Sequence, residues 1–351
     1  MSLRITRLAN LATPPAGWGQ KCSWTSDGIY LAQVGNWAPY IDIYKNNNGV
    51  LTKLANPDVS PSNSPNSCAF SPDGNYLVVA QTMSPYILIY KRSGDTFTKL
   101  VNPIVVTTNS PELPKYNLWD CAWTSDSTYL AVAGADTRSL IVYKRSGDSF
   151  SIITGIDTGV IPSASGLSCA WSPDDTYLVC THNVSPYLSI YKRNGDVFTH
   201  LSEPAVLPAA STANCAFSPD GTILVVTSFS APNVYLYIYT RVGDVFTQQA
   251  LPTSLPDHSI SGIAFSPNSK YLAITVSGLY GDPSSLRMYQ NDNNVLSKLA
   301  TIDASLNYPG HAVAFSPDGL YLAFTYELSP YLILYSVTES SFFMLQPIFI
   351  G

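Results

Sequence analysis

Charged side chains are scarce in this sequence: Lys, Arg, Asp and Glu make up 12% of its 351 residues, and the formal net charge is −6. A mildly acidic chain with few cations lacks the broad basic surface of a nucleic-acid-binding protein. Long apolar runs are missing as well, so we expect no spanning helix and no membrane insertion. No secretory signal follows Met1, and we expect a soluble protein that is synthesised in the cytoplasm.

What the sequence does contain is 46% hydrophobic residues, together with 23 Tyr, 26 Pro and 21 Gly. This much apolar material can bury a core, so the chain is not disordered. Abundant Tyr, Thr and Val with frequent Pro and Gly are typical of short strands joined by turns. The composition therefore favours an all-β protein.

One phrase recurs seven times along the chain. In its second copy it reads Cys-Ala-Phe-Ser-Pro-Asp-Gly-Asn-Tyr-Leu, over residues 68–77. The copies begin near residues 22, 68, 121, 169, 215, 263 and 313, at intervals of 46 to 53 residues. A period near this length is typical of the blades of a β-propeller. We therefore predict that residues 1–351 form one domain, a closed ring of seven blades.

Each copy contains four strand-like segments. In the second copy the first segment ends at Phe70, and the other three cover residues 76–80, 87–90 and 97–100. Ser-Pro-Asp-Gly follows the first segment and Ser-Gly-Asp follows the third, and both are turn sequences in which Pro presets φ or Gly accepts positive φ. The pattern predicts four antiparallel strands per blade.

The phrase Ala-Phe-Ser-Pro-Asp-Gly followed by Tyr-Leu resembles the inner-strand signature of WD-repeat propellers and of their bacterial and viral relatives. The resemblance extends from about Cys22 to Tyr335. It implies the seven-bladed fold but no single function, because such propellers serve many roles. Here the third strand ends in Tyr-Lys where a WD repeat has Trp-Asp, and the Gly-His pair is missing, so the family's buried polar network is not expected. Low charge and near-verbatim repeats also resemble phage and viral structural proteins.

Both ends of the chain are candidates for the strand that closes the ring. Residues 1–12 resemble the fourth strand of a blade, and residues 339–351 follow the third strand of the last copy. One interpretation is that the spare segment contacts a partner. The other is that both segments pack on the last blade, which then has a five-stranded sheet. The C-terminal segment is unusually apolar, and its candidate assembly residues are Phe342, Phe343, Leu345, Ile348 and Phe349.

Five of the six cysteines occupy one position of the repeat, where the last two copies have Ile263 and Val313. We therefore expect buried, reduced thiols without metal-ligand spacing. The Lys-Arg pairs that end the third strands precede an Asp in the same turn, as in Lys91 to Asp95. A basic ring for an anionic partner and a set of charge-balanced turns are both open, and we favour the balanced turns.

We expect the loops between the second and third strands, and those between blades, to form one face that is rich in aromatic and amide side chains. Such side chains on a rigid scaffold are typical of binding surfaces. The candidate binding residues are Trp37, Tyr86, Trp119, Arg138, His182, Tyr187, Tyr235, Tyr280 and Tyr331. Tyr40, Tyr86, Tyr187 and Tyr331 recur in register after Pro and therefore favour a structural role in the turn. Trp37, Trp119 and Tyr280 do not recur in register and are the better binding candidates.

Signals for catalysis are weak. The four His residues have no metal or triad spacing, and Asp120 and Asn214, which could face the central channel, do not form a carboxylate cage with their equivalents. We therefore predict no cofactor and no metal. The leading hypothesis is a non-enzymatic scaffold that binds protein partners through the loop face or a terminal strand, within a larger assembly such as a virion. The alternatives are a carbohydrate-binding adhesin or receptor-binding protein, and a lactonase-like hydrolase.

Overall fold

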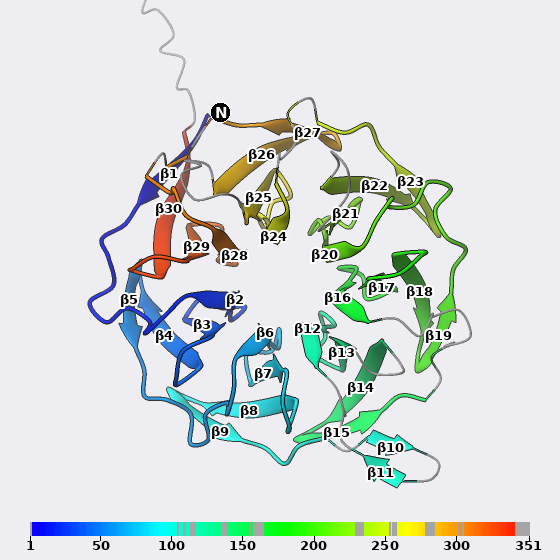
Figure 1. Cartoon of the computed structure of the whole chain (residues 1–351), viewed down its shortest axis with the longest axis horizontal. Coiled ribbons are helices and arrows are strands. Elements are labelled where there is room, and N and C mark those ends of the chain that lie inside the picture. Colours follow the sequence, from blue (N-terminus) through cyan, green and yellow to red (C-terminus); the bar gives the residue numbers. More distant parts are fainter. Residues whose placement is uncertain are drawn as a thin grey trace, which may run out of the picture.

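The computed structural model describes residues 2–103, 105–107, 110–112, 117–134, 139–154, 156, 165–228, 235–252, 254, 258–277, 285–300, 302–303 and 305–340. These residues form seven four-stranded antiparallel sheets and one two-stranded sheet. The seven sheets are arranged as blades around a central axis (Figure 1). The predicted seven-bladed propeller is confirmed.

Within each blade the strands follow one another from the channel to the rim (Figure 1). Blade 1 comprises β2 (Gly19–Trp24), β3 (Tyr30–Gly35), β4 (Ile41–Asn47) and β5 (Val50–Lys53). Blade 2 comprises β6 (Pro65–Phe70), β7 (Tyr76–Gln81), β8 (Ile87–Ser93) and β9 (Thr96–Lys99). Blade 3 comprises β12 (Leu118–Trp123), β13 (Tyr129–Gly134), β14 (Leu140–Ser146) and β15 (Ser149–Ile152). Blade 4 comprises β16 (Gly166–Trp171), β17 (Tyr177–His182), β18 (Leu188–Asn194) and β19 (Val197–His200). A short hairpin of β10 (Val105–Thr107) and β11 (Ser110–Glu112) lies between blades 2 and 3 in the sequence.

The remaining blades follow the same plan. Blade 5 comprises β20 (Thr212–Phe217), β21 (Ile223–Ser228), β22 (Leu236–Val242) and β23 (Val245–Gln248), and blade 6 comprises β24 (Ile260–Phe265), β25 (Tyr271–Val276), β26 (Leu286–Asp292) and β27 (Val295–Lys298). Blade 7 combines β28 (Gly310–Phe315), β29 (Tyr321–Tyr326) and β30 (Leu332–Ser340) with β1 (Ser2–Arg7). In the described part of the chain, no helix is long and apolar enough to cross a bilayer.

The N-terminal strand closes the ring. β1 pairs with β30 in an antiparallel register from Ser2↔Ser340 to Arg7↔Tyr335, and so takes the place of a fourth strand. Leu3 and Ile5 pack against the hydrophobic cluster that joins blades 6 and 7. Residues 1–12 are thus the closing segment, and the sheet of blade 7 has four strands among the described residues. Of the other candidate, residues 339–351, the first two belong to β30, and residues 341–351 lie outside the described residues.

The hydrophobic core lies between neighbouring blades. All six residues of most second strands are buried, as in β7, because each of these strands is covered on both faces by the adjoining blades. The Tyr that ends the apolar part of each third strand is also buried, for example Tyr90, whose hydroxyl donates to the Val59 carbonyl at 2.8 Å. All six cysteines are buried and free, as expected for core positions.

A recurrent group of polar side chains, which we call the clasp, joins neighbouring blades near the hairpin turns. Between blades 2 and 3, Tyr76 donates from its hydroxyl to Asp148 at 2.6 Å, and Lys91 pairs with the same carboxylate at 2.7 Å. The Arg145 guanidinium lies over the Tyr76 ring, 4.9 Å from its centroid. The charge of the turns is therefore balanced, as predicted, but Lys91 is neutralised by Asp148 of the next blade and not by Asp95 of its own turn.

The clasp repeats at four of the seven interfaces. Its other members are Tyr30, Lys45, Arg92 and Asp95; Tyr129, Lys144, Arg193 and Asp196; and Tyr177, Lys192, Arg241 and Asp244. The interfaces of blades 6–7 and 7–1 keep the Tyr, as Tyr271 and Tyr321, but all three remaining interfaces have other residues at the Lys, Arg and Asp positions. Four clasps in series hold blades 1 to 5 together at the end of the ring that carries the hairpin turns.

We expect the clasps to make thermal stability depend on pH in the acid range. Lys91 and Tyr76 lower the pKa of Asp148, and equivalent partners lower the pKa of Asp95, Asp196 and Asp244. A lowered folded-state pKa adds stability that is present above the unfolded value of about 3.9 and is lost as the pH falls through the folded value. Replacing the four aspartates by Asn should therefore lower Tm at neutral pH.

The difference in Tm between the wild type and this fourfold variant should shrink as the pH falls from about 5 to about 2.5, because protonation abolishes the same interactions. Differential scanning calorimetry across this range measures it. A Tm difference that stays constant with pH would show that the aspartates act through packing and not through charge.

Candidate binding face

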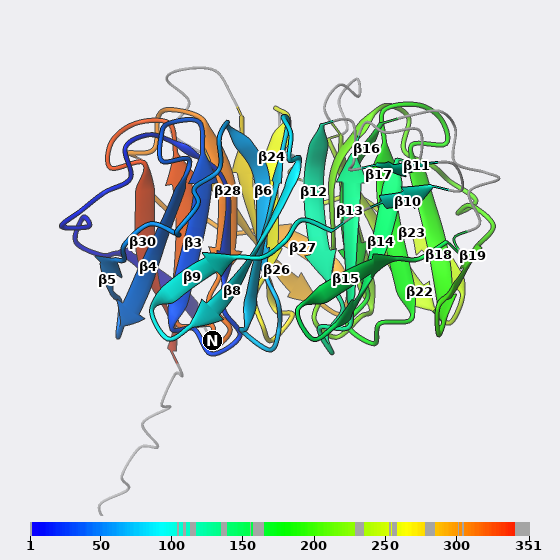
Figure 2. The same ribbon diagram turned by 90° about the horizontal axis from the view of Figure 1, so that it is seen from below.

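The two ends of the propeller differ in the connections they carry. Figure 2 shows the described connections between second and third strands, and those between blades, at the upper end. The hairpin turns that join first to second strands and third to fourth strands lie at the lower end. The upper end, which we call the loop face, is where the sequence predicts binding. The backbone of this face is held by the buried strands below it.

Four of the connections between second and third strands are turns of the same kind. In blade 1 the Tyr40 amide donates to the Trp37 carbonyl at 2.7 Å, across a cis Ala38–Pro39 bond. A cis proline at the third position defines a type VI turn. Blades 2, 4 and 7 repeat it with the cis bonds Ser84–Pro85, Ser185–Pro186 and Ser329–Pro330. The recurrent Tyr has positive φ and accepts from the last residue of the second strand, as Tyr86 does from Gln81.

The first position of these turns is apolar and exposed. It is occupied by Trp37, Met83, Val184 and Leu328, which are 62%, 59%, 40% and 40% exposed. The sequence singled out Trp37 as a residue without equivalents, and the shared turn shows that its position does recur, with a different apolar side chain each time. The Trp37 ring lies beside Gly17, where an added Cβ would come within 2.0 Å of Cδ1. These four residues form a set of apolar side chains around the loop face.

The recurrent tyrosines lie lower in the turns. Tyr86, Tyr187 and Tyr331 are half-buried, and Tyr235 of blade 5 is half-buried against the cluster between blades 5 and 6. Tyr86 packs on the cluster of blades 2 and 3. Their place is consistent with the structural role expected for the Pro-Tyr pairs, while part of each ring stays accessible to a partner.

His182 does not reach the surface. It is the last residue of β17 and is 0% exposed, with Nε2 at 2.9 Å from the Ser189 hydroxyl. Burial lowers its pKa to about 4, so the ring is neutral near pH 7. A side chain enclosed in this way cannot contact a partner, and His182 is not carried into the proposal below. Arg138 and Tyr280 lie outside the described residues, as do Phe342, Phe343, Leu345, Ile348 and Phe349.

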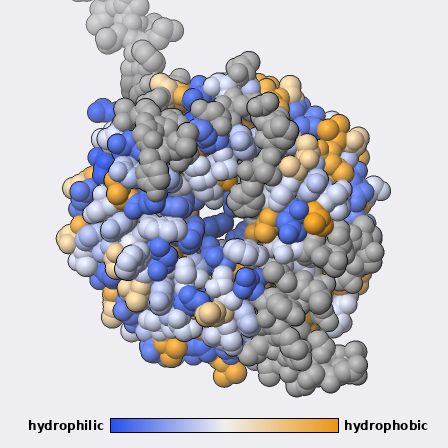
Figure 3. All heavy atoms as spheres, viewed as in Figure 1, coloured by the Kyte–Doolittle hydropathy of each residue, from blue (hydrophilic) through white to orange (hydrophobic). Residues whose placement is uncertain are grey.

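A cavity of about 370 Å³ opens in the central channel near the loop face. It is lined by the beginnings of the first strands and includes Trp119, Asp120, Asn214 and His311. Figure 3 shows mainly hydrophilic residues around the central opening. The expectation that Asp120 and Asn214 face the channel is confirmed.

Asp120 of blade 3 contacts residues of three other blades. Its carboxylate accepts hydrogen bonds from Ser67 at 2.7 Å and from Ser168 at 2.6 Å, and lies 3.3 Å from the Lys21 ammonium. Burial opposes the charge of Lys21, but Asp120 outweighs it and raises the pKa of Lys21. This carboxylate is 8% exposed, and all its strong contacts are internal. The Asp120 carboxylate therefore joins blades of the ring.

Two aromatic residues that line this cavity have buried polar atoms without partners. Trp119 Nε1 and His311 Nε2 are buried and have no hydrogen-bond partner among the described residues. The His311 ring stacks on Trp18 at 4.2 Å, and burial lowers its pKa to about 4. Trp119, predicted as a binding residue, thus lies in the channel and not at the apex of a loop. Within the described residues, no group of three or more His, Cys, Asp or Glu is arranged to hold a metal ion.

Comparison with known proteins supports the fold. The family model described as "WD domain, G-beta repeat" (WD40) matches residues 249–289, which begin just after β23 of blade 5 and end within β26 of blade 6. Among solved structures, the β-propeller domain of Cps50 (Swd1) from Myceliophteria thermophila superposes with a TM-score of 0.66 at 12% identity, over 94% of this chain and 99% of that chain. A comparison with curated proteins gave no match. At such low identity the structural similarity concerns the architecture alone.

Proposed function

We propose that this chain is a non-enzymatic scaffold that binds a protein partner through its loop face. The observation that carries the proposal is the set of exposed apolar side chains at equivalent turns, Trp37, Met83, Val184 and Leu328. Exposed apolar groups on rigid turns, surrounded by polar residues, are typical of protein interfaces. The half-buried rings of Tyr86, Tyr187, Tyr235 and Tyr331 add contact area at low cost in conformational entropy.

A triple variant tests the loop face. Trp37→Ser, Met83→Ser and Leu328→Ser together remove the largest of these side chains without touching the core. We expect the immobilised wild type to retain specific partners from cells that make the protein, and the triple variant to lose them. Because truncating a central aromatic residue commonly costs about 2 kcal/mol or more of binding, a loss of at least 30-fold in affinity is expected for a purified partner.

The matched control places the same kind of change at the other end of the molecule. Val242, Val245 and Val295 are 79%, 63% and 67% exposed beside the hairpin turns, and their replacement by Ser should leave binding unchanged. Mass spectrometry compares the proteins retained by the wild type, the loop-face variant and this control variant. Binding is then confirmed with purified proteins. If the loop-face variant keeps every partner, the binding surface lies elsewhere and the proposal fails.

The finer proposal is that the partner belongs to a larger assembly, such as a virion in which the chain is a structural or decoration component. Low charge and near-verbatim repeats support this, as does the apolar C-terminal segment, whose residues Phe342 and Phe343 follow β30 in sequence. Because β1 already fills the fourth place in blade 7, residues 341–351 are not needed to close the ring. Light scattering on the full chain and on a chain ending at Ser340 tests whether this segment mediates association.

One observation favours a glycan as the alternative ligand. Trp119 lines the cavity in the central channel, near the loop face, and its ring is half-buried. Indole rings can stack on the apolar faces of sugars. Two results together would favour a glycan over a protein partner. The wild type would be retained on a glycan array while Trp119→Ala is not, and the immobilised wild type would capture no protein that the loop-face variant loses.

A further inference from the structure

The fourth strand of each blade has one edge that faces away from the ring (Figure 1). In blade 2 the connection from blade 1 covers this edge of β9. The Asp58 amide donates to the Phe97 carbonyl at 3.3 Å, and the Asp58 carboxylate accepts from the Lys99 amide at 2.8 Å. In blade 4 the connection from blade 3 forms a parallel bridge between Ile156 and Phe198 of β19. At these two blades the chain covers an exposed strand edge with its own backbone.

The connection that leads into blade 1 follows the same course. Tyr44 donates from its hydroxyl to the Thr13 carbonyl at 3.3 Å, as Tyr90 of blade 2 does to that of Val59 at 2.8 Å. Thr13 thus corresponds to Val59, and Ala12 stands where blade 2 has its capping aspartate. Alanine has no carboxylate that could accept from the edge of the strand.

The outer edge of β5 is therefore left without partners. β5 pairs with β4 in the register in which β9 pairs with β8, so the groups that point outwards are the Leu51 carbonyl and the Lys53 amide. The structure describes all of residues 8–13 and 48–53, and no hydrogen bond joins these two segments. A groove of about 460 Å³, which we call the β5 groove, lies between them.

The β5 groove offers apolar side chains beside this edge. Leu8 and Leu11 line it and are half-buried against the cluster between blades 7 and 1, and Val50 at its hairpin end is 66% exposed. Of the described residues that line it, Lys53 alone is charged, and its ammonium pairs with Asp42. An unpaired strand edge beside apolar side chains suits an extended, uncharged peptide that adds a strand through its backbone.

The chain itself carries a peptide of this kind. Residues 341–351 contain no Asp, Glu, Lys or Arg, and Phe, Ile, Leu and Met make up most of them. They are not needed to close the ring, since β1 fills the fourth place in blade 7. Eleven residues extend over at most about 40 Å, which is longer than a strand of four residues such as β5.

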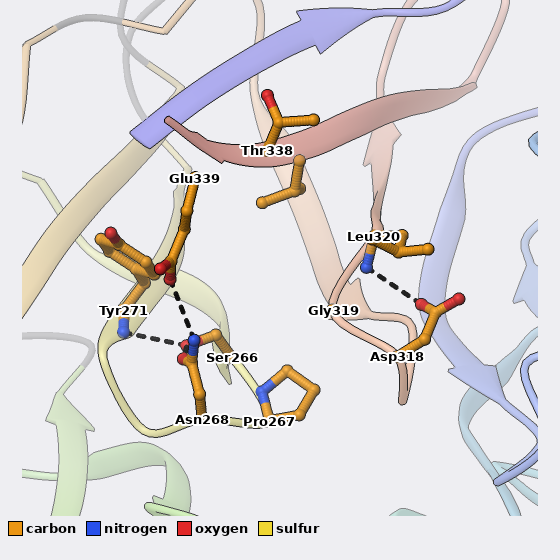
Figure 4. Close-up of a pocket in the computed structure, with 10 residues that line it drawn as sticks. Ser266, Pro267, Asn268, Tyr271, Asp318, Gly319, Leu320, Thr338 and Glu339 are labelled. Carbon is orange, nitrogen blue, oxygen red and sulfur yellow. Dashed lines mark hydrogen bonds between the residues drawn. The ribbon is translucent and has the colours of Figure 1, made fainter. Parts of the chain in front are cut away.

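The end of β30 is held on the side of blade 7 that faces blade 6. Glu339 accepts from Asn268 at 3.0 Å and from Lys270 at 3.2 Å, and Figure 4 shows it directed at Asn268. The groove at this place has the carboxylates of Asp318 and Glu339, so it does not suit an uncharged apolar segment. The β5 groove lies on the other side of blade 7, towards blade 1. The C-terminal segment therefore leaves β30 on the side away from the β5 groove of its own chain.

We propose that residues 341–351 of one copy bind in the β5 groove of a second copy, as an added strand on the edge of β5. The inference rests on the proposal that this segment mediates association, and it names the surface that receives the segment. A backbone amide of the segment donates to the Leu51 carbonyl, and one of its carbonyls accepts from the Lys53 amide. The two contacting surfaces are different, so association is head-to-tail and continues beyond a dimer unless a ring closes.

The first measurement uses a fluorescein-labelled peptide of residues 341–351, made soluble by a polyethylene glycol chain. Its target is the chain that ends at Ser340, which keeps the β5 groove and has no segment of its own to compete. We expect the fluorescence anisotropy to rise with a dissociation constant on the order of 0.1 mM. The mirror-image peptide of D-amino acids is equally apolar but cannot pair with the edge of β5 in the same way. It should bind at least tenfold more weakly.

Ala12→Asp gives blade 1 the aspartate that caps β9 in blade 2. The variant should fold, because Ala12 is exposed and the aligned residue is an aspartate in the native chain. The new carboxylate accepts from the Lys53 amide and places a charge against the apolar peptide, so binding should fall at least tenfold. The matched control, Ala205→Asp, adds the same charge in the connection into blade 5, where Tyr239 donates to the Val206 carbonyl. It should leave binding unchanged.

The same change should act on association of the full chain. Light scattering should give a mass that rises with concentration for the wild type and for Ala205→Asp. The mass should remain that of a monomer for Ala12→Asp and for the chain that ends at Ser340. Thermal unfolding of each variant shows whether it is folded.

Three results would overturn the inference. The first is equal binding of the peptide by the chains with and without Ala12→Asp, or equal binding of the mirror-image peptide, which decides the question even where Ala12→Asp does not fold. The second is association that is lost without residues 341–351 but kept in Ala12→Asp; the segment would then mediate assembly through another surface, and only the assembly proposal would stand. The third is a full chain that stays monomeric and does not bind the added peptide, because its own segment would then fill the β5 groove.

Discussion

Deleting residues 1–10 is expected to lower the free energy of unfolding by roughly 5 kcal/mol, because the deletion removes buried apolar area and a full ladder of backbone hydrogen bonds. β1 contributes six paired residues to blade 7, and Leu3 and Ile5 to the cluster between blades 6 and 7. The loss would expose the edge of β30 along its length. Urea unfolding followed by tryptophan fluorescence measures the change.

The matched control removes a segment of similar length from the other end. A chain that ends at Ser340 keeps every residue that pairs with β1, and its unfolding midpoint should stay close to that of the full chain. A synthetic peptide of residues 1–10, added to the N-terminally shortened protein, should restore part of the lost stability by mass action. If the C-terminal truncation were the more damaging one, residues 341–351 and not β1 would hold the ring closed.

Replacing Asp120 by Ala is the second change with a large expected effect. The Asp120 carboxylate is 8% exposed and accepts from Ser67 and Ser168, while the Lys21 ammonium lies beside it. Removing one partner of a buried pair leaves the other uncompensated, which costs up to about 5 kcal/mol. Because the Lys21 side chain is 36% exposed, solvent reduces this penalty, and we expect a loss of about 3 kcal/mol.

Two comparisons separate the charge from the packing. Asp244→Ala removes the same group from a half-exposed clasp and should have a much smaller effect. The double variant Lys21→Met and Asp120→Leu removes both charges and should recover a substantial part of the loss, because replacing both partners of a buried pair is often nearly neutral. Equal losses for Asp120→Ala and Asp244→Ala would show that the channel carboxylate is no more important than a surface one.

The ring of seven blades could be predicted because every blade carries its own signals. Ser-Pro-Asp-Gly marks the turn after the first strand in several copies, and an apolar run marks the second strand, so the fold depends on local patterns repeated many times. The closing strand could not be chosen in this way. Residues 2–7 and 341–347 both fit the fourth place, and the choice depends on contacts between the two ends of the chain that no local pattern encodes.

The partners of the clasp were missed for a related reason. Asp95 lies four residues after Lys91 in the sequence, whereas Asp148, the acid that Lys91 contacts, is 57 residues away. Adjacent blades pack face to face, so the nearest charge belongs to the neighbouring repeat. Trp37 was misjudged in a similar way. It occupies the same position of the turn as Met83, but the two side chains differ, so the sequence alone does not show that they are equivalent.

The channel was predicted only in part. Asp120 directly precedes the recurrent, buried Cys of its strand. Because neighbouring side chains of a strand point to opposite sides, the sequence indicated that Asp120 faces the channel. That it would be held by Ser67 and Ser168 of the flanking blades required the ring to be assembled first. The burial of His182 was missed because the end of a second strand is covered by the neighbouring blade, which the sequence of one repeat does not show.

The pairing of β1 with β30 also has a consequence for biosynthesis. The contact between Thr6 and Ser336 joins residues 330 positions apart, so β1 leaves the ribosome long before its partner β30 and has to wait for it. At about 5–20 residues per second, this wait is roughly 20 to 60 s. During translation the nascent chain can build blades 1 to 6 one after another, while its leading strand stays unpaired. Completion of the ring thus waits until β30 has been made, and a ribosome that stalls before blade 7 would release an open arc with two unsatisfied ends.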